Sequence, residues 1–295
     1  MERLKYSDLL SHLEGFDRWL TSLGLALRPN DRIHEAFKVL RKAEEASRRG
    51  RETGNYVDIS PGDWFPIVEA LEAHDVFTAF LNEQTSAIAS ALKRALSGPI
   101  QPIGESSKNR DGRNTWFELA LAAEWKLRGA SVSLGEPDLR LTRDGATFLV
   151  ACKRPANEES VQANLYNAVK QLRRNLDAAP DSCFGVVAVS LSCAFNAGDQ
   201  VSTGELSALG RLLEIELERC RPYLNTVHDP RICCVLFHVA TPGIGGNKVD
   251  LVRASFTVAQ ELTPSIGSKI FEQHARDMGN QPKQIWEQGA SSNLQ

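Results

Sequence analysis

Two kinds of hydrophobic patterning divide the chain. Residues 1–97 carry apolar side chains at spacings of three and four, the periodicity of amphipathic helices, and show no alternating strand pattern. One helix is predicted to end at Gly50, and helical spacing then continues to a stop at Gly98-Pro99. The pattern therefore predicts an all-helical N-terminal domain.

Beyond residue 114, short apolar strands alternate with helices. The predicted elements are a helix at 115–129, strands at 131–134, 138–143 and 146–153, a helix at 157–178, a strand at 183–192, a helix at 203–222, and strands at 231–240 and 250–262. This alternation is typical of an α/β fold with a central mixed sheet flanked by helices.

The segment between the two patterns, "PIQPIGESSKNRDGRN", is rich in proline, glycine, serine and charge. Such composition indicates an interdomain linker or a mobile loop. We therefore predict a helical recognition or oligomerisation domain at 1–105 and an α/β domain at 106–270. The polar residues 271–295 are predicted to form a C-terminal tail that frays at its end.

Composition is ordinary for a soluble globular protein, with 42% hydrophobic and 24% charged residues among 295. The N-terminus is amphipathic and carries acids early, unlike a signal peptide, and no apolar run is long enough for a membrane helix. We expect a cytoplasmic protein with no membrane partner. The net charge of −3 gives no global basic field, so nucleic acid would have to bind at local basic stretches such as 41–51, 108–113 and 170–174.

The six cysteines do not indicate a metal site. None forms a CxxC pair, and no cysteine and histidine cluster has zinc spacing. Most lie in apolar stretches such as "RICCVLFHVA", which predicts reduced, buried thiols.

Candidate chemistry lies in one hairpin, "GEPDLRLTRDGATFLVACKRP" (135–155). Asp144-Gly145 predicts a two-residue type I′ turn, because both central positions of that turn need a positive φ. The resulting register places Asp138 opposite Ala151, and strand alternation puts both on one face with Lys153. An acid at position 151 would meet Asp138 across a small cation.

Glu118 is a further candidate on the preceding helix, where apolar residues follow it at i+3, i+4 and i+7. That spacing favours a carboxylate that faces inward. The alternative is a capping box, in which Glu118 accepts from the backbone of Thr115 at the start of the helix. One side chain cannot easily do both.

These features together resemble the PD-(D/E)xK, or restriction-endonuclease-like, nuclease superfamily. The matching elements are the helix with Glu118, Pro137-Asp138, and Ala151-Cys152-Lys153 within "ACKRP", in the order helix, hairpin, helix, strand. The resemblance covers about 65 residues well and about 150 loosely, within the size of a single domain. It implies a restriction-endonuclease-like sheet within the α/β domain.

The resemblance also implies roles for individual residues. Asp138, Glu118 and the backbone carbonyl of Cys152 would bind Mg²⁺ or Mn²⁺, and Lys153 would act on the attacking water and the phosphate. Gln171, on the following helix, would hydrogen-bond the site or a backbone phosphate. A further match to the family, Gln162-x-x-x-Tyr166, lies so close after Lys153 that chance explains it equally well.

The family pattern breaks at Ala151, where a second acid is expected. Loss of one of two carboxylates should weaken metal binding and slow cleavage by orders of magnitude. Either an engineered glutamate-to-alanine change, which we favour, or a natural degenerate member that binds without cutting accounts for the alanine. An unrelated α/β fold that mimics the motif is a third reading.

The sequence therefore predicts a metal-dependent nuclease, inactive with Ala151, that acts on nucleic acid, with DNA favoured. The N-terminal helices would bind a partner protein or a second copy of the chain. Restriction or phage defence follows by analogy with the class. The rival is a catalytically degenerate scaffold of the same fold that binds nucleic acid or protein.

Overall fold

The computed structural model describes residues 6–53, 64–106, 108–196, 202–203, 229–245 and 248–259, with a few positions between 215 and 227 and between 269 and 273. These residues form two compact units. The first unit comprises Met1–Leu127, Asn196–Glu205 and Thr241–Val252, and the second comprises Arg128–Phe195, Leu206–Ala240 and Arg253–Gln295. The helix with Glu118 is thus grouped with the N-terminal helices, and the domain boundary at residue 105 stays a prediction.

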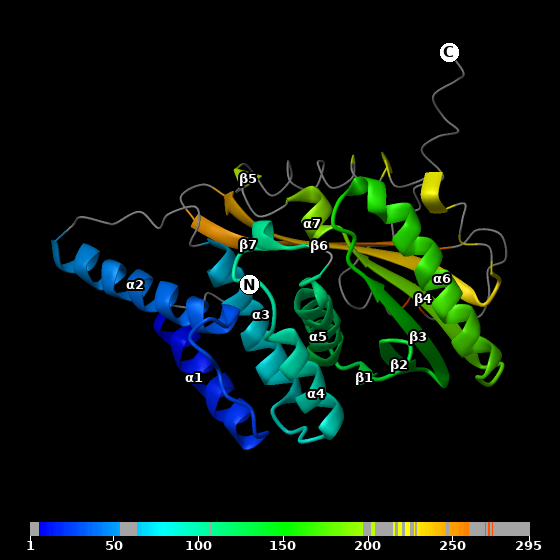
Figure 1. Ribbon diagram of the computed structural model, residues 1–295, viewed down its shortest axis with the longest axis horizontal. Helices are drawn as coiled ribbons and strands as arrows, with labels where there is room; N and C mark the ends of the chain where they lie inside the picture. Colours follow the sequence, from blue (N-terminus) through cyan, green and yellow to red (C-terminus); the bar gives the residue numbers. More distant parts are fainter. Residues whose placement is uncertain are drawn as a thin grey trace, which may run out of the picture. The chain divides into compact units, whose positions relative to one another are not determined.

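Helices make up the start of the first unit, as predicted. They are α1 (Tyr6–Ser22), α2 (Arg32–Thr53), α3 (Trp64–Phe80), α4 (Ser86–Ala95), the short 3₁₀ helix η2 (Pro102–Gly104) and α5 (Asp111–Leu127). Helix α3 packs against α1, α2 and α5, and α4 packs against α5 (Figure 1). Large apolar side chains with little or no exposure, such as Phe16, Leu40 and Trp125, fill the space between them.

Helix α5 begins at Asp111, four residues earlier than predicted. Thr115 is therefore a buried residue inside the helix, and the capping box of Thr115 and Glu118 is wrong. The preceding segment, predicted as a linker or mobile loop, is held by hydrogen bonds. The Asn109 side chain donates to the Gly104 carbonyl at 3.2 Å and accepts from the Ser106 amide at 2.7 Å.

A mixed sheet forms the centre of the second unit, which confirms the predicted α/β class. Its strands are β1 (Ser131–Leu134), β2 (Leu139–Arg143), β3 (Ala146–Lys153), β4 (Cys183–Ser190) and β6 (Ile232–Gly245), of which residues 232–240 belong to this unit. They lie side by side in that order, antiparallel from β1 to β3 and parallel from β3 to β6. Strands β5 (Ser202–Thr203) and β7 (Lys248–Ala259) both pair with β6.

The hairpin between β2 and β3 has the predicted turn and register. Asp144 and Gly145 have φ values of 49° and 79°, the positive pair that a type I′ turn requires. Arg143 pairs with Ala146, and the ladder runs to Leu139 opposite Val150. One further step places Asp138, just before β2, level with Ala151.

Helix α6 (Val161–Asp177) connects β3 to β4 and covers one face of both strands (Figure 1). The 3₁₀ helix η3 (Glu158–Ser160) precedes α6, and Asn157 caps η3 through a reciprocal capping box with Ser160. The buried stripe of α6 packs against sheet residues that include Leu149 and Ala151. On the opposite face, Phe148 contacts Phe184 and Phe271, with its ring centroid 5.9 and 5.5 Å from theirs. Phe271 therefore anchors the start of the predicted tail.

Several predictions fall on other parts of the chain. The helix at 203–222 and the tail at 271–295 lie largely outside the described residues. The five described cysteines are buried and form no disulfide, as predicted, while Cys220 is outside this set. In the described residues, every helix is too short or too polar to cross a bilayer.

Candidate functional site

Asp138 directly precedes β2 in the chain. Its carboxylate adds one more hydrogen bond to those that β2 makes with β3. Oδ2 accepts a hydrogen bond from the Cys152 amide at 2.7 Å, so the side chain replaces the backbone carbonyl that a longer β2 would supply. The Asp138 side chain is only 16% exposed. Burial raises the pKa of Asp138 above its ordinary value of 3.8, and the charge of Lys153 opposes this rise.

Lys153, the last residue of β3, projects its ammonium onto three oxygen atoms. Nζ donates to the Cys152 carbonyl at 2.9 Å and to Gln171 Oε1 at 2.7 Å, and it lies 3.6 Å from Asp138 Oδ2. The side chain is 20% exposed, so the ion pair is partly open to solvent. The ammonium is thus enclosed by one carboxylate, one peptide carbonyl and one amide oxygen.

Gln171 joins the site from α6 and fixes the positions of its neighbours. Its Nε2 donates to the Pro137 carbonyl at 3.0 Å and to Asp138 Oδ1 at 3.3 Å, while Oε1 accepts from Lys153. Only this orientation of the amide satisfies both ends, since a lysine has no acceptor and a carbonyl no donor. The sequence analysis expected Gln171 to hydrogen-bond the site or a backbone phosphate, and its contacts in this structure are with Pro137, Asp138 and Lys153. Its role in a functional site stays a prediction.

Ala151 shares the face of β3 that carries Lys153. Its methyl group is fully buried in the apolar core beneath α6, away from Phe148 on the other face. The position therefore has the predicted orientation but adds no oxygen to the site. We call Asp138, the Cys152 carbonyl, Lys153 and Gln171 the Lys153 cluster.

The other residues that the sequence analysis singled out are Glu118, Gln162 and Tyr166. Glu118 lies half-buried on α5 in the first unit, and its role beside Asp138 stays a prediction. Gln162 and Tyr166 are exposed on α6, with Tyr166 at 59%, and neither contacts Asp138, Lys153 or Gln171 in the described structure. The Gln162 and Tyr166 match is therefore a feature of the solvent face.

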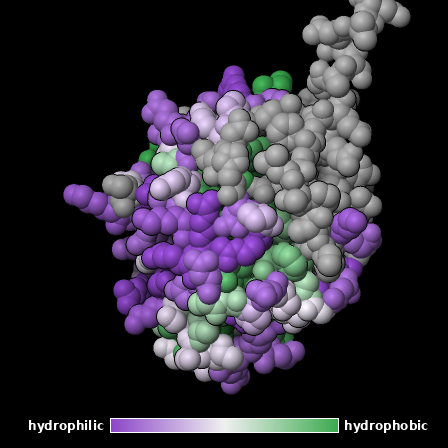
Figure 2. Space-filling model, turned by 90° about the vertical axis from the view of Figure 1, so that its right-hand side faces the viewer, coloured by the Kyte–Doolittle hydropathy of each residue, from purple (hydrophilic) through white to green (hydrophobic). Residues whose placement is uncertain are grey.

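The solvent face of α6 is mostly polar, and Figure 2 shows the side of the molecule on which it lies, where hydrophilic residues predominate. Its exposed basic residues are Lys170, Arg173 and Arg174. Arg173 pairs with Asp229 at 3.2 Å, which leaves part of this charge already neutralised. The stretch 170–174 is nevertheless a basic surface in the same unit as the Lys153 cluster.

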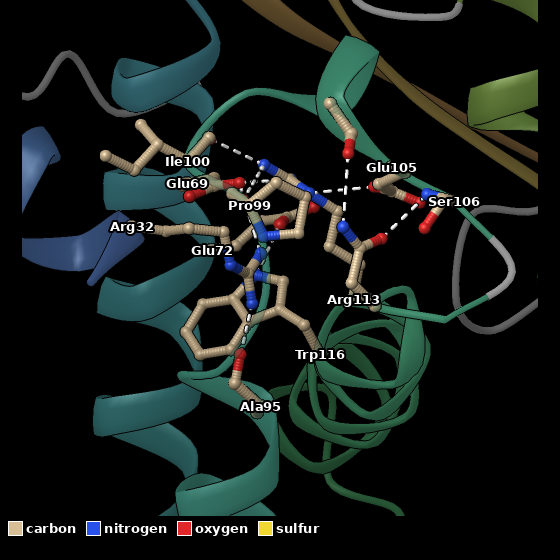
Figure 3. A network of polar contacts seen from close by, with 12 residues as sticks. Arg32, Glu69, Glu72, Ala95, Pro99, Ile100, Glu105, Ser106, Arg113 and Trp116 are labelled. Carbon is tan, nitrogen blue, oxygen red and sulfur yellow. Dashed lines mark hydrogen bonds and ion pairs between the residues drawn. The ribbon is translucent and has the colours of Figure 1, made fainter. Parts of the chain in front are cut away.

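A second charged cluster, in the first unit, has no counterpart in the sequence analysis. Arg32 and Arg113 converge on the buried carboxylate of Glu69, and Arg113 Nε also lies 2.8 Å from Glu105 Oε1 (Figure 3). We call these four residues the Glu69 network. They come from three helices and a loop, so no local spacing in the sequence could indicate that they meet.

The Glu69 network also binds backbone and aromatic groups. Arg113 donates to the Ile100 carbonyl at 2.7 Å, and Arg32 donates to the Ala95 carbonyl. The Arg32 guanidinium lies over the ring of Trp116, 5.6 Å from its centroid (Figure 3). These contacts anchor the segment before α5, and the stretch 108–113 therefore supplies a buried arginine as well as surface charge.

The residues present do not fit the Mg²⁺ that the resemblance implies. Mg²⁺ takes hard oxygen ligands in near-octahedral geometry, usually with one or two carboxylates and substrate phosphates. The Lys153 cluster offers one carboxylate, both of whose oxygens already accept hydrogen bonds, and the ammonium lies against that carboxylate and the Cys152 carbonyl. Within the described part of the chain, no three His, Cys, Asp or Glu side chains gather to hold a metal ion.

Comparison with known proteins gives no family assignment. No family model, no curated protein and no solved structure matches the chain.

Proposed function

We propose that the second unit is a nuclease-like domain of the PD-(D/E)xK kind, which acts on nucleic acid and which Ala151 leaves deficient in cleavage. The observation that supports this proposal best is the meeting of Asp138, Lys153 and Gln171 in one hydrogen-bonded cluster. The resemblance assigned a role in the site to each of these residues, which come from a loop, a strand and a helix. The chain order β1, β2, β3, α6, β4 in this unit, with α5 of the first unit directly before it in the sequence, also accords with the order in that superfamily.

Each residue of the cluster has a property that phosphodiester chemistry uses. Lys153 supplies a partly exposed positive charge that can contact a phosphate oxygen. Gln171 holds Lys153 and Asp138 in fixed positions, so the charge does not have to be ordered when substrate binds. A second carboxylate at position 151 would give the cluster the net negative charge that binding of Mg²⁺ or Mn²⁺ needs while Lys153 is present. DNA is the favoured substrate class, and restriction or phage defence the favoured setting, by analogy with the superfamily.

A second candidate is a scaffold that binds nucleic acid or protein and does not cleave. It is favoured by the complete burial of Ala151 in an apolar core, because a larger, charged side chain there has to displace well-packed neighbours. Under this alternative, alanine is the natural residue at position 151 and part of the packed core.

The deciding experiment restores the acid. Ala151→Glu is compared with the unchanged chain, with Ala151→Gln, which has the same size but no charge, and with Ala151→Glu/Lys153→Ala. Each protein is incubated with plasmid DNA, single-stranded DNA and RNA, with Mg²⁺, with Mn²⁺ and with a chelator. Melting curves establish that each variant folds.

We expect metal-dependent cleavage by Ala151→Glu at a rate orders of magnitude above the other three proteins. Its melting temperature should also rise with added metal, through binding to the native state. If Ala151→Glu and Ala151→Gln melt alike, and neither binds metal nor cleaves any substrate, the scaffold replaces the nuclease as the reading of this domain.

A further inference from the structure

In the chain as it stands, the oxygens that resemble a metal site already surround a cation. Asp138 Oδ2, the Cys152 carbonyl and Gln171 Oε1 lie 3.6, 2.9 and 2.7 Å from Lys153 Nζ. The first two are the oxygens that the resemblance assigns to the metal. With Lys153 in this conformation, its ammonium fills the space between them that a hydrated divalent ion would need.

Charge balance gives an independent reason for the same assignment. Asp138 and Lys153 together have no net charge, so the cluster has no excess negative charge to attract a divalent cation. With a second acid at position 151 the sum would be −1, but the side chain there is an alanine methyl group buried in the core. A divalent ion entering the present cluster would meet the repulsion of Lys153 against the attraction of a single carboxylate.

We infer that the Lys153 ammonium is the resident cation of this cluster, and that it excludes divalent metal from a latent site of three oxygens. The metal-ligating property of the oxygens is therefore masked by Lys153 rather than lost. Hard divalent cations such as Mn²⁺ are the ligand class that would bind once the ammonium is removed, because the donors are carboxylate, carbonyl and amide oxygens.

The test measures Mn²⁺ alone, without nucleic acid. Binding is followed by the electron paramagnetic resonance signal of free Mn²⁺, at neutral pH and low ionic strength. The full chain is compared with Lys153→Met, which keeps the length of the side chain and removes its charge. Lys170→Met is the matched control, since it removes an exposed lysine of the same unit that does not touch the cluster. Asp138→Asn/Lys153→Met removes the carboxylate from the opened site.

We expect Lys153→Met to bind one Mn²⁺ at least tenfold more tightly than the unchanged chain and Lys170→Met do. The double variant should return to the level of the unchanged chain. Should Lys153→Met fold poorly, Lys153→Ala serves as a second variant with the same expected gain. Circular dichroism melting decides which variant is used.

Two results would overturn the inference. One is binding of Mn²⁺ by the unchanged chain as tight as that by the lysine variant, which would mean that the ammonium excludes nothing. The other is a folded lysine variant that binds no better than the unchanged chain. Neither result depends on cleavage, so failure of Ala151→Glu to cut and failure of this inference are separate outcomes.

Discussion

The Glu69 network and the Lys153 cluster both pair cations with carboxylates, but they differ in depth. The side chains of Arg32, Glu69, Glu105 and Arg113 are 2–9% exposed, whereas those of Asp138 and Lys153 are 16% and 20% exposed. In the first network the cations bind acids and backbone carbonyls that hold helices and a loop in place. In the second cluster a lysine remains within reach of solvent at the end of a strand.

That difference in depth separates a structural role from a ligand-binding role. Charges as buried as Arg32 and Glu69 cannot exchange their partners for a ligand without exposing an uncompensated charge. Lys153 can do so at lower cost, because water can replace part of its contact. We therefore expect substitutions in the Glu69 network to change stability, and substitutions in the Lys153 cluster to change binding more than stability.

The largest expected effect on stability is that of Glu69→Gln. Glutamine keeps the shape of the side chain but removes the negative charge between two buried guanidinium groups, which should lower the free energy of unfolding by about 3–5 kcal/mol. Urea denaturation followed by tryptophan fluorescence measures this loss, since four of the five tryptophans, at 19, 64, 116 and 125, lie in the first unit. A loss below about 1 kcal/mol, the value typical of an exposed pair, would contradict a large contribution of this network to the free energy of unfolding.

A smaller effect is expected for Asp138→Ala. The change leaves the Cys152 amide without its acceptor and Lys153 without its counter-ion, which should cost about 1–3 kcal/mol. Hydrogen exchange of peptides from β2 and β3, followed by mass spectrometry, measures the opening free energy of the hairpin. Arg140→Ala, an exposed position on β2, is the control and should leave exchange nearly unchanged. Equal exchange in both variants would show that Asp138 does not hold the two strands together.

The pH dependence of the hairpin should have a definite sign. Because burial raises the pKa of Asp138 above 3.8, the fold favours its protonated form, and the stability from this group is full below pH 3.8 and is lost as pH rises through the raised pKa. Relative to Asp138→Asn, which does not titrate, the unchanged chain should therefore gain stability when pH falls from 7 to 4. Hydrogen exchange at both pH values, corrected for intrinsic rates, tests this difference. A gain in stability as the pH rises from 4 to 7 would contradict a raised pKa of Asp138.

The smallest effect should be that of Glu35→Ala on α2. Glu35 pairs with Lys38 at 2.8 Å on the helix surface, where the lysine side chain is 54% exposed. Such i,i+3 pairs contribute about 0.2–0.5 kcal/mol. The same fluorescence measurement used for Glu69→Gln should detect almost no change, and raised salt should remove what remains. A loss as large as that of Glu69→Gln would mean that exposure does not set the energy of these pairs.

The hairpin was predictable because its determinants are local. Asp144-Gly145 specifies the turn, the turn specifies the register, and the register places Asp138, Ala151 and Lys153 on one face. Gln171 was assigned from the resemblance. Its place in the site depends on α6 lying over β3, which no local pattern dictates.

What the sequence could not provide depends on long-range packing. The start of α5 was misplaced because Thr115 and Glu118 match a capping box, while the true beginning at Asp111 follows a segment that Arg113 and Asn109 hold in place. The sequence did not predict the Glu69 network because its members are far apart in the chain. The sequence also did not predict that Lys153 contacts the oxygens that the resemblance assigns to a metal, since the register gives the direction of a side chain but not the conformation of its four methylene groups.

The two-residue turn at Asp144-Gly145 makes this loop intolerant of changes in length. Surface loops usually accept insertions, but one added residue here would shift β2 against β3 and move Asp138 out of line with the Cys152 amide that it caps. In a library of insertions across the chain, we expect a sharp minimum in recovered folded protein at 144–145. We therefore expect the hairpin to tolerate substitutions of its surface residues but not insertions or deletions among them.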